Sequence, residues 1–401
     1  MAFTGIAATL LPNGRTVHKT LGLPVPLYND SSSSIKVQSK EGLFLKETKV
    51  FIWDEAPMAP RYALEIVNRT LKSIMNNDVP FGDKIIILGG DFRQLLPIKV
   101  RGTRSETLSL SIKYSESWKH FTTYNLSANM RVLPNEVDFA QYLLSVGDGT
   151  LNDANDNLTL PQQCIMEPNN NVAQIVFGGF IAEKNFEKMS KCAILSARNI
   201  DVDEINKQVT NLLDNNSEQI YTGIDSTENC NNGELDEIIL PEYLNSLNPS
   251  SLPPYELRLR KNCIVMLIRN ISINEGLCNG TRLRVIDFSN HLLKCKILTG
   301  DETNDIVFLN RISLYCENEY PFSFKRRLFP VKLAFAMTIN KSQGQTFQRI
   351  AIDLRRDVFN HGQLYVAMPR VRSWDSLKIY LGDHPIENLQ VKNYVYKELY
   401  L

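Results

Sequence analysis

Short apolar runs that end in polar residues are the most regular feature of this chain. Residues 50–53 (VFIW) and 85–88 (IIIL) are continuous apolar runs rich in β-branched and aromatic side chains. Such runs are typical of strands buried on both faces of a parallel sheet. Residues 59–74, between them, repeat apolar side chains at helical spacing and end before Pro80, which cannot continue a helix. The order strand, helix, strand predicts an α/β fold.

The second half of the chain repeats this pattern and adds a different one. Buried strands are predicted at 192–196, 331–336 and 350–354, and helices at 134–146, from 202 onward and at 359–372. Short apolar runs separated by turns predict a small antiparallel barrel or sandwich over 262–268, 281–286, 292–298 and 305–309. We also expect an alternating strand at 121–126 and a polar surface excursion at 214–254.

Polar side chains follow the first two predicted strands directly. Asp54 and Glu55 come after the first strand, and Gly89-Gly90-Asp91-Phe92-Arg93-Gln94 comes after the second. In open α/β sheets, ligands bind at the carboxyl ends of the strands. Two adjacent carboxylates there can take two different roles in phosphoryl transfer: one holds Mg²⁺, and the other orients the attacking water. Gln94 suits a γ-phosphate sensor, because an amide both donates and accepts hydrogen bonds. The alternative for the carboxylates is a strand that ends in an acidic turn.

Basic and polar residues elsewhere are candidates for phosphate binding. Arg131 suits an arginine finger, because guanidinium matches phosphate oxygens, although an arginine after a strand is usually a surface residue. Arg370 and Arg372 lie near the end of the helix predicted at 359–372, where favourable charge at a helix C-terminus is the alternative. Residues 338–346 form a polar strand-to-helix turn suited to a sugar-phosphate backbone.

Composition narrows the class of protein. The 401 residues allow two or three domains, and the net charge of zero means that any nucleic-acid surface is local. Seven cysteines without a C-x-x-C pair indicate reduced thiols in an intracellular protein without a zinc site. No apolar run reaches membrane-spanning length, and the first residues do not have the pattern of a signal peptide.

Eight sequence blocks carry a resemblance to a known family. They are TGIAATLLPNGRTVHKTLGLP (4–24), WDEAPM, PFGDKIIILGGDFRQLLPI (80–98), LSANMRV, ILSARNIDVDEIN (194–206), NEGLCNGTRL (274–283), FPVKLAFAMTINKSQGQTF and HGQLYVAMPRVRS. In this order they resemble the petite-integration-frequency (Pif-type) DNA helicases, superfamily-one enzymes that move 5′ to 3′. The match is closest to the helicase part of Helitron-like transposons and their cellular relatives.

The resemblance implies two RecA-like domains of the P-loop NTPase type, with parallel sheets. We expect the first domain over residues 1–130, and the first part of the second over 131–261 with a surface excursion at 207–256. An SH3-like β insert is expected over 262–328, and the rest of the second domain over 329–401. Domain closure on ATP and opening after hydrolysis would pull single-stranded DNA along a groove.

The resemblance also assigns roles to residues. Asp54 would hold Mg²⁺ through water, Glu55 would activate the attacking water, and Gln94 would sense the γ-phosphate. Arg131 and Arg370 would reach ATP, as would Gly344 and Gln345. The implied DNA contacts are Thr4, Gly5, Arg15, His18, Asn340, Lys341, Ser342, Gln343, Thr346 and His361. A single histidine is more often structural, which is the alternative for His18.

The implied cofactors are ATP and Mg²⁺, and the implied partners are single-stranded and forked DNA. The implied activity is ATP-dependent unwinding in DNA repair, recombination, telomere and genome maintenance or rolling-circle transposition. We expect a monomer that contacts no membrane and acts in the nucleus, with the mitochondrion left open.

Two departures from the family pattern affect the expected activity. The family carries a Gly-rich P-loop just before the first block, but no G-x-x-x-x-G-K-[ST] occurs in these 401 residues. We therefore expect a chain truncated inside its first motif, with weak ATP binding and slow hydrolysis. Met368-Pro369 stands where the family usually has Leu-Ser, and proline can kink the helix that aims Arg370. The alternatives are a non-catalytic DNA-binding protein or transposon remnant, and a gene fragment whose P-loop lies upstream.

Overall fold

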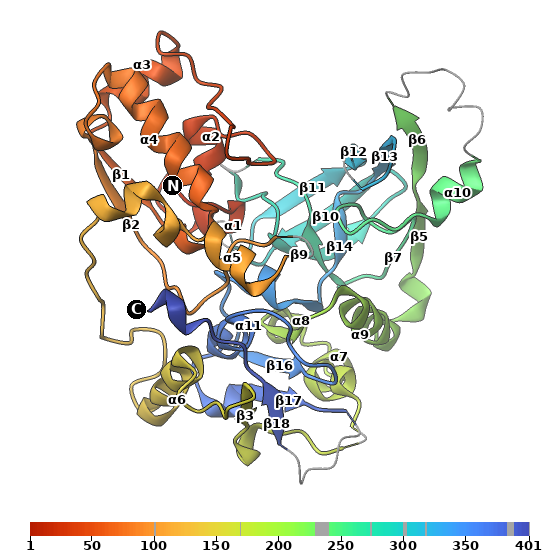
Figure 1. The fold of residues 1–401 in the computed structure, drawn as a ribbon. Helices are drawn as coiled ribbons and strands as arrows, with labels where there is room; N and C mark the ends of the chain where they lie inside the picture. Colours follow the sequence, from red (N-terminus) through yellow and green to blue (C-terminus); the bar gives the residue numbers. More distant parts are fainter. Residues whose placement is uncertain are drawn as a thin grey trace. The chain divides into compact units, whose positions relative to one another are not determined.

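A computed structural model describes residues 1–99, 102–168, 170–228, 240–272, 275–299, 303–316, 319–382 and 389–400. The chain forms two compact units. Figure 1 shows its helices and strands with their labels. Unit 1 comprises Met1–Cys164, Arg356–Asp375 and Glu387–Leu401, and unit 2 comprises Ile165–Arg355 and Ser376–Ile386. Each unit therefore combines stretches that are far apart in the sequence.

Unit 1 is built on a two-stranded parallel sheet. Strands β1 (Val50–Trp53) and β2 (Ile85–Leu88) pair in register, and helix α4 (Arg61–Met75) connects them with the help of a short turn at Pro80–Asp83. One face of this sheet packs in a core around Phe51 and Trp53, together with the apolar side of α4. The opposite face carries four apolar side chains that are 45–58% exposed: Val50, Ile52, Ile85 and Ile87. The predicted strand–helix–strand unit is present.

Unit 1 contains further helices and one more pair of strands. Its helices are α1 (Gly5–Thr9), α2 (Val17–Leu21), α3 (Lys40–Glu47), α5 (Arg104–Leu110), α6 (Val137–Asp148) and α11 (Gln363–Ala367). Strands β3 (Asn157–Thr159) and β18 (Gln390–Lys392) pair antiparallel. Helix α5 begins with a complete capping box, in which Thr103 and Glu106 satisfy each other's backbone amides.

Unit 2 contains a four-stranded parallel sheet in the order β15-β4-β16-β17. Its strands are β4 (Cys192–Ser196), β15 (Ala336–Thr338), β16 (Arg349–Asp353) and β17 (Leu377–Tyr380). Every residue of β4 is buried, as expected for a central strand in a parallel sheet. Helix α9 (Asn199–Leu212) follows β4, and its buried Asn206 side chain bonds to the backbone of Ala336 and Leu333. The helices α7 (Gly179–Ala182) and α8 (Phe186–Ser190) precede β4.

Antiparallel strands make up the rest of unit 2. A five-stranded sheet has the order β11-β10-β9-β8-β14, and smaller sheets have the orders β12-β13-β6 and β5-β7. The bounds are β5 (Gln219–Thr222), β6 (Ile224–Glu228), β7 (Glu256–Leu259), β8 (Ile264–Leu267), β9 (Arg282–Phe288), β10 (Leu292–Ile297), β11 (Ile306–Asn310), β12 (Ile312–Cys316), β13 (Ser323–Leu328) and β14 (Val331–Leu333), with helix α10 at Pro241–Ser246. The predicted run of short antiparallel strands is therefore present.

A buried ion pair fastens the antiparallel part. Arg326 on β13 binds both carboxylate oxygens of Asp225 on β6, at 2.8 and 2.7 Å, and neither side chain is more than 1% exposed. The same guanidinium donates to the carbonyls of Leu247 and Pro253. These bonds satisfy a buried charge completely enough to make its burial tolerable.

Three predictions from the sequence are wrong. Residues 121–126 form no strand, because Tyr124 and Leu126 are exposed and no strand among the described residues pairs with them. The region 214–254 is not a loop without secondary structure, since it contains β5, β6 and α10. Residues 229–239 lie outside the described part. The helix predicted at 359–372 is only five residues long, Gln363–Ala367. It starts after Gly362, whose φ is +70°, and turns into a tighter helical turn at Met368–Arg370, which contains Pro369.

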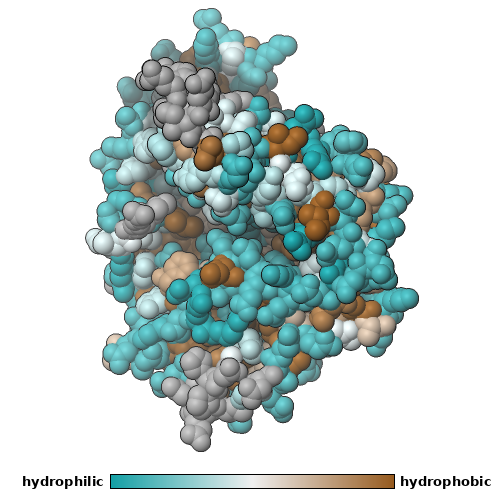
Figure 2. All heavy atoms as spheres, turned by 90° about the vertical axis from the view of Figure 1, so that its right-hand side faces the viewer, coloured by the Kyte–Doolittle hydropathy of each residue, from teal (hydrophilic) through white to brown (hydrophobic). Residues whose placement is uncertain are grey.

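The surface and the cysteines agree with an ordinary globular protein. The face in Figure 2 is mainly hydrophilic, with apolar residues at several separate places. Six cysteines in the described part are buried and form no disulfide. The described part also holds no helix with the length and apolar character needed to span a bilayer.

Candidate functional site

The two strands of unit 1 end beside each other and present the predicted acidic pair. Trp53 pairs with Leu88, and Asp54-Glu55 follow directly on β1. The amide of Gly89 donates to the carbonyl of Trp53 at 2.8 Å, so the two chains stay joined beyond the strands. The carboxyl ends of both strands therefore meet at one edge of the sheet, where a ligand binds in open α/β folds.

Two glycines make this close approach possible. A Cβ atom on Gly89 would lie 3.1 Å from Oδ1 of Asp54. A Cβ atom on Gly90 would lie 2.3 Å from Cδ of Pro57, and Gly90 has a φ of +152°. Only glycine fits this position without moving the chain, so the sequence Gly-Gly after β2 has a steric reason.

The acidic pair is held in a strained backbone conformation. Glu55 has φ 51° and ψ 38°, which is left-handed and uncommon for a residue with a side chain. Its amide donates to Oδ1 of Asp54 at 3.0 Å, and both residues are half-buried. Strain of this kind is frequent at functional sites, where it fixes side chains in advance of binding.

The loop after β2 is cross-linked by side chains that the sequence analysis did not single out. Asp91 accepts hydrogen bonds from the amide of Arg93 at 2.9 Å and from the hydroxyl of Tyr365 at 2.8 Å. Arg93 in turn donates to Asp148 at 2.7 Å. Gln94 follows in this loop and is half-buried, and its amide donates to the carbonyl of Asp91 at 3.1 Å. The network therefore fixes the backbone that carries Gln94.

His361 and Gly362 attach the segment before α11 to the same loop. Nδ1 of His361 accepts from the amide of Tyr396 at 2.9 Å, so the proton sits on Nε2, which donates to the carbonyl of Phe92 at 2.8 Å. The ring is fully buried, and burial lowers its pKa. A Cβ atom on Gly362 would lie 2.4 Å from the carbonyl oxygen of Arg93. Both ring nitrogens of His361 are engaged with backbone, which argues against the predicted DNA contact.

Arg370 lies buried in unit 1, and Glu55 is one of the charged groups that act on it. The residue is 2% exposed, and its Nε donates to the carbonyl of Val366 at 2.8 Å. Burial, and to a smaller extent the charge of Arg131, lower its pKa to about 9, although Glu55 and Tyr365 act in the opposite direction. The guanidinium is still charged at pH 7. A buried guanidinium presents a fixed fork of N–H donors that matches the oxygens of a phosphate group.

Arg131 and Asp54, the candidate ligand of Mg²⁺, are less buried than Arg370. Arg131 is exposed, and its carbonyl accepts from Nε of Arg372 at 2.9 Å. In the described part of the chain, no three His, Cys, Asp or Glu side chains gather into a metal site. Asp54 would therefore hold Mg²⁺ together with water and phosphate oxygens, which is how Mg²⁺ is commonly bound.

The four candidate DNA contacts near the start of the chain lie in unit 1. Thr4 caps α1 by accepting from the amide of Ala7 at 3.3 Å, and Gly5 is the first residue of that helix. Arg15 is exposed. His18 is half-buried against Phe3, with ring centroids 4.9 Å apart, and burial lowers its pKa. Arg15 is thus the most accessible of the four.

The candidates at 340–346 lie in unit 2. Lys341 and Thr346 are exposed, and Asn340 and Gly344 are half-buried. Ser342, Gln343 and Gln345 are buried. Ser342 Oγ donates to the carbonyl of Ile339 at 2.7 Å, and Gln345 Nε2 donates to the carbonyl of Lys341 at 3.0 Å. The turn is therefore braced from inside, and it presents Lys341 and Thr346 to solvent.

The sequence pattern indicated only part of the network around Asp91 and Arg93. Asp91 and Arg93 stand in the same loop as Gln94, so their position after β2 was informative. The partners Asp148 and Tyr365 are 55 and 274 residues away from them. No local pattern predicts pairs so distant.

Comparisons with known proteins agree with this geometry. A family profile described as "PIF1-like helicase" matches residues 1–157, and one described as "DNA helicase Pif1, 2B domain" matches residues 242–288. The chain is 28% identical to "ATP-dependent DNA helicase Pif1" of Psychrobacter sp. (strain PRwf-1), covering 94% of this chain and 60% of that protein. It is 25% identical to "ATP-dependent DNA helicase PIF1" of Homo sapiens, covering 94% and 53%. The chain thus spans between half and two thirds of these relatives.

Solved structures show the same fold. The crystal structure of Bacteroides Pif1 bound to ssDNA superposes with a TM-score of 0.67 at 21% identity, covering 96% of this chain and 82% of that one. The crystal structure of Pif1 helicase from Candida albicans gives 0.67 at 23% identity, covering 100% and 86%. The predicted α/β class with RecA-like domains is confirmed. Family profiles, relatives and fold agree, and this chain is therefore similar to the PIF1-like helicases over most of its length.

Proposed function

We propose that this chain works as an ATP-dependent DNA helicase that moves 5′ to 3′ along single-stranded DNA. The observation that carries the proposal is the placement of Arg370, which is buried in the same compact unit as Glu55 and is electrostatically coupled to it. In phosphoryl transfer, a carboxylate or amide can orient the attacking water, and an arginine can stabilise the negative charge of the transition state.

The chain's own residues divide the work. Glu55 orients the attacking water and accepts its proton, and its fixed backbone conformation limits its movement. Gln94 reports whether a γ-phosphate is present, through the loop that Asp91 and Arg93 brace. Arg370 and Arg131 stabilise negative charge as it develops. Bound ATP supplies the phosphoryl group and the free energy of its hydrolysis, and Asp54 would hold the Mg²⁺ that accompanies it.

Names of similar structures support nucleotide and DNA as ligands. One is the crystal structure of Pif1 helicase from Bacteroides in complex with ADP-AlF3 and ssDNA, and another concerns unwinding at forked dsDNA by two coordinating Pif1 helicases. We propose that Arg15 and Thr4 of unit 1, and Lys341 and Thr346 of unit 2, contact the sugar-phosphate backbone. Work at forked DNA in the nucleus, in repair, recombination or transposition, is part of the same proposal.

The test is DNA-stimulated ATP hydrolysis by the 401-residue chain. Turnover should rise with single-stranded DNA and fall by at least about a hundredfold in Glu55→Gln, because the water loses its base. Glu47→Gln changes an exposed carboxylate at the end of α3 and should leave turnover unchanged. Direction is read from a duplex with a single-stranded tail, which should be opened with a 5′ tail and not with a 3′ tail. Equal turnover in Glu55→Gln and the parent would contradict the proposal.

A second candidate function rests on the sequence itself. These 401 residues contain no G-x-x-x-x-G-K-[ST] pattern, and such a loop normally cradles the phosphates. The second candidate is a DNA-binding protein without hydrolysis. The same experiment separates the two, because salt-dependent binding of single-stranded DNA without turnover would favour the second.

A further inference from the structure

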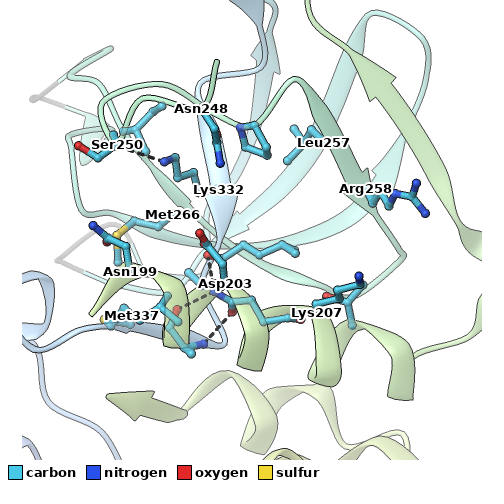
Figure 3. A pocket seen from close by; sticks show the side chains of 18 of the residues that line it. Asn199, Asp203, Lys207, Asn248, Ser250, Leu257, Arg258, Met266, Lys332 and Met337 are labelled. Carbon is cyan, nitrogen blue, oxygen red and sulfur yellow. Dashed lines mark hydrogen bonds between the residues drawn. The ribbon is translucent and has the colours of Figure 1, made fainter. Parts of the chain in front are cut away.

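Unit 2 contains a pocket that includes Lys341, one of the proposed DNA contacts. It has a volume of about 760 Å³ and lies between helix α9 and the strands β7, β8 and β14 (Figure 3). Lys332 lines it together with the carboxylates of Asp203 and Glu319, so cations and anions are mixed in its walls. The pocket is covered by the proposed DNA contact, whereas residues 393–400 of unit 1 make contacts that the proposed function does not explain.

Residues 393–400 contact the loop after β2 through Tyr400. The guanidinium carbon of Arg93 lies 5.9 Å from the centre of the Tyr400 ring, which is within the range of a cation–π contact. The Tyr400 hydroxyl donates to the carbonyl of Gly147 in α6 at 3.2 Å. Nε of Arg93 donates to Asp148, the next residue of α6, at 2.7 Å. Tyr400 and the end of α6 therefore bind each other and both bind Arg93.

Gly147 shows how closely these groups are packed. A Cβ atom on Gly147 would lie 2.8 Å from Cδ of Arg93 and 2.7 Å from Cδ2 of Tyr365. Tyr365 in turn donates its hydroxyl to Asp91 at 2.8 Å. The Arg93 side chain therefore lies against α6 without spare room, and Tyr400 is the contact that residues 393–400 add to it.

The same segment also contacts the chain that follows the loop. Leu399 is fully buried in an apolar cluster that includes Leu96. Arg104 at the start of α5 binds both carboxylate oxygens of Glu398, at 3.0 and 2.8 Å. This ion pair is exposed and adds little by itself, so the buried leucine is the main anchor. The segment is therefore joined to the chain both before and after Gln94.

We propose that Tyr400 is a positioning residue for Gln94. It holds the side chain of Arg93, and thereby fixes the loop backbone from which the Gln94 amide reaches a γ-phosphate. The role of Gln94 rests on the proposed function, whereas the hold of Tyr400 on the loop does not. Phosphoryl transfer depends on exact placement of the groups around the phosphate, so a looser loop lowers the rate of the chemical step.

Hydrogen exchange of the nucleotide-free 401-residue chain measures the hold on the loop. The Gln94 amide donates to the carbonyl of Asp91 at 3.1 Å, and Tyr400→Ala should speed its exchange about three- to tenfold. Tyr400→Phe keeps a ring over Arg93 and should exchange nearly as slowly as the parent chain. Tyr28→Ala removes an exposed ring elsewhere in unit 1 and should leave the exchange rate unchanged. Tyr400 is 36% exposed, so its truncation should leave unit 1 folded.

DNA-stimulated ATP hydrolysis measures whether the hold acts through Gln94. Tyr400→Ala should lower kcat about three- to tenfold and change KM for ATP less than about twofold, and Tyr400→Phe should restore most of kcat. In a Gln94→Ala background, Tyr400→Ala should lower kcat no further, because the group that it positions is gone. An equal fall of kcat in both backgrounds would overturn the inference, since Tyr400 would then act independently of Gln94.

The two measurements separate this inference from the proposed function. Equal exchange at the Gln94 amide in the parent chain and in Tyr400→Ala would overturn the inference, whatever the turnover. A parent chain without turnover has failed the proposed function, and the exchange rates then decide alone whether Tyr400 holds the loop. Faster exchange in Tyr400→Ala, together with a fall of kcat that disappears in the Gln94→Ala background, is the result expected if both are correct.

Discussion

The two parallel sheets of this protein differ in how completely they are covered. In unit 2, β4 has all five of its residues buried. In unit 1, β1 and β2 bury one face and expose Val50, Ile52, Ile85 and Ile87 on the other. The two sheets have the same strand direction and similarly apolar sequences. The difference shows that an apolar run predicts a strand reliably, but does not reveal how many layers of structure cover it.

The catalytic candidates belong to the less covered sheet. Asp54 and Glu55 follow β1, and the loop with Gln94 follows β2. These residues are fixed mainly by hydrogen bonds to distant segments, including the bonds from Tyr365 to Asp91 and from His361 to Phe92. In unit 2, packing on both faces of β4 holds the sheet together with the hydrogen bonds of the Asn206 side chain.

Truncating one side chain in each sheet tests the comparison most strongly. Leu195→Ala in β4 should cost about 2–5 kcal/mol, because it leaves a cavity in a close-packed layer. Ile52→Ala should cost less than about 1 kcal/mol, because more than half of that side chain already faces solvent. Urea unfolding measures both. Tryptophan fluorescence follows unit 1, which contains Trp53, Trp118 and Trp374, and far-UV circular dichroism follows the whole chain. Equal costs would mean that β1 is covered in solution.

Two glycines, Gly90 after β2 in unit 1 and Gly179 in α7 of unit 2, provide a second comparison with a smaller expected change in the free energy of unfolding. Gly90→Ala should destabilise unit 1 by about 1–3 kcal/mol, because its φ of +152° and its 2.3 Å approach to Pro57 both exclude a Cβ atom. Gly179→Ala is the matched control, since a Cβ atom there meets nothing within 4 Å and the residue lies in α7. That change should stabilise by about 0.5–1 kcal/mol. Denaturant midpoints for both variants give the answer, and a neutral Gly90→Ala would show that the loop can move aside.

The free energy of unfolding of unit 1 should depend on pH, because His361 joins two of its segments by hydrogen bonds. The pKa of His361 is lowered by burial, so the unfolded chain binds its proton more readily than the folded one. The contribution of the neutral ring is present above the unfolded pKa of about 6.5 and is lost as pH falls below it. Tryptophan fluorescence during urea unfolding at pH 7.5 and 5.5 should therefore show a loss on the order of 1 kcal/mol that is smaller in His361→Gln. An identical loss in the variant would assign the effect to other groups.

Changing the exposed sheet face should affect solubility more than stability. Ile52→Thr and Ile85→Thr keep β-branched side chains and should change the free energy of unfolding by less than about 0.5 kcal/mol. They should slow aggregation on heating, because an exposed apolar face on a sheet is an aggregation site. Light scattering measures the rate. Lys294→Gln, which changes an exposed residue of β10, serves as a control for a substitution on a sheet outside this face.

The sequence predicted those parts of the fold that depend on local pattern. The strands β1, β2, β4 and β16 were expected from continuous apolar runs, and α4 from helical spacing. The strand expected at 121–126 failed because alternation alone does not supply a partner strand. The acidic pair was predicted from its place after β1. The burial of Arg370 and the bond between Asp91 and Tyr365 depend on contacts across more than 200 residues, which no local pattern contains.

The discontinuous make-up of unit 1 has a consequence for synthesis on the ribosome. Unit 1 needs residues 356–375 and 387–401 in addition to its first 164 residues. Translation delivers Glu55 and Gln94 early, but His361, Tyr365 and Arg370 only after nearly all of unit 2 has been made. A nascent chain therefore contains the acidic pair, Asp54 and Glu55, before it contains Arg370. Arg370 can join the acidic pair only after residue 370 has been translated, when most of unit 2 has already had time to fold.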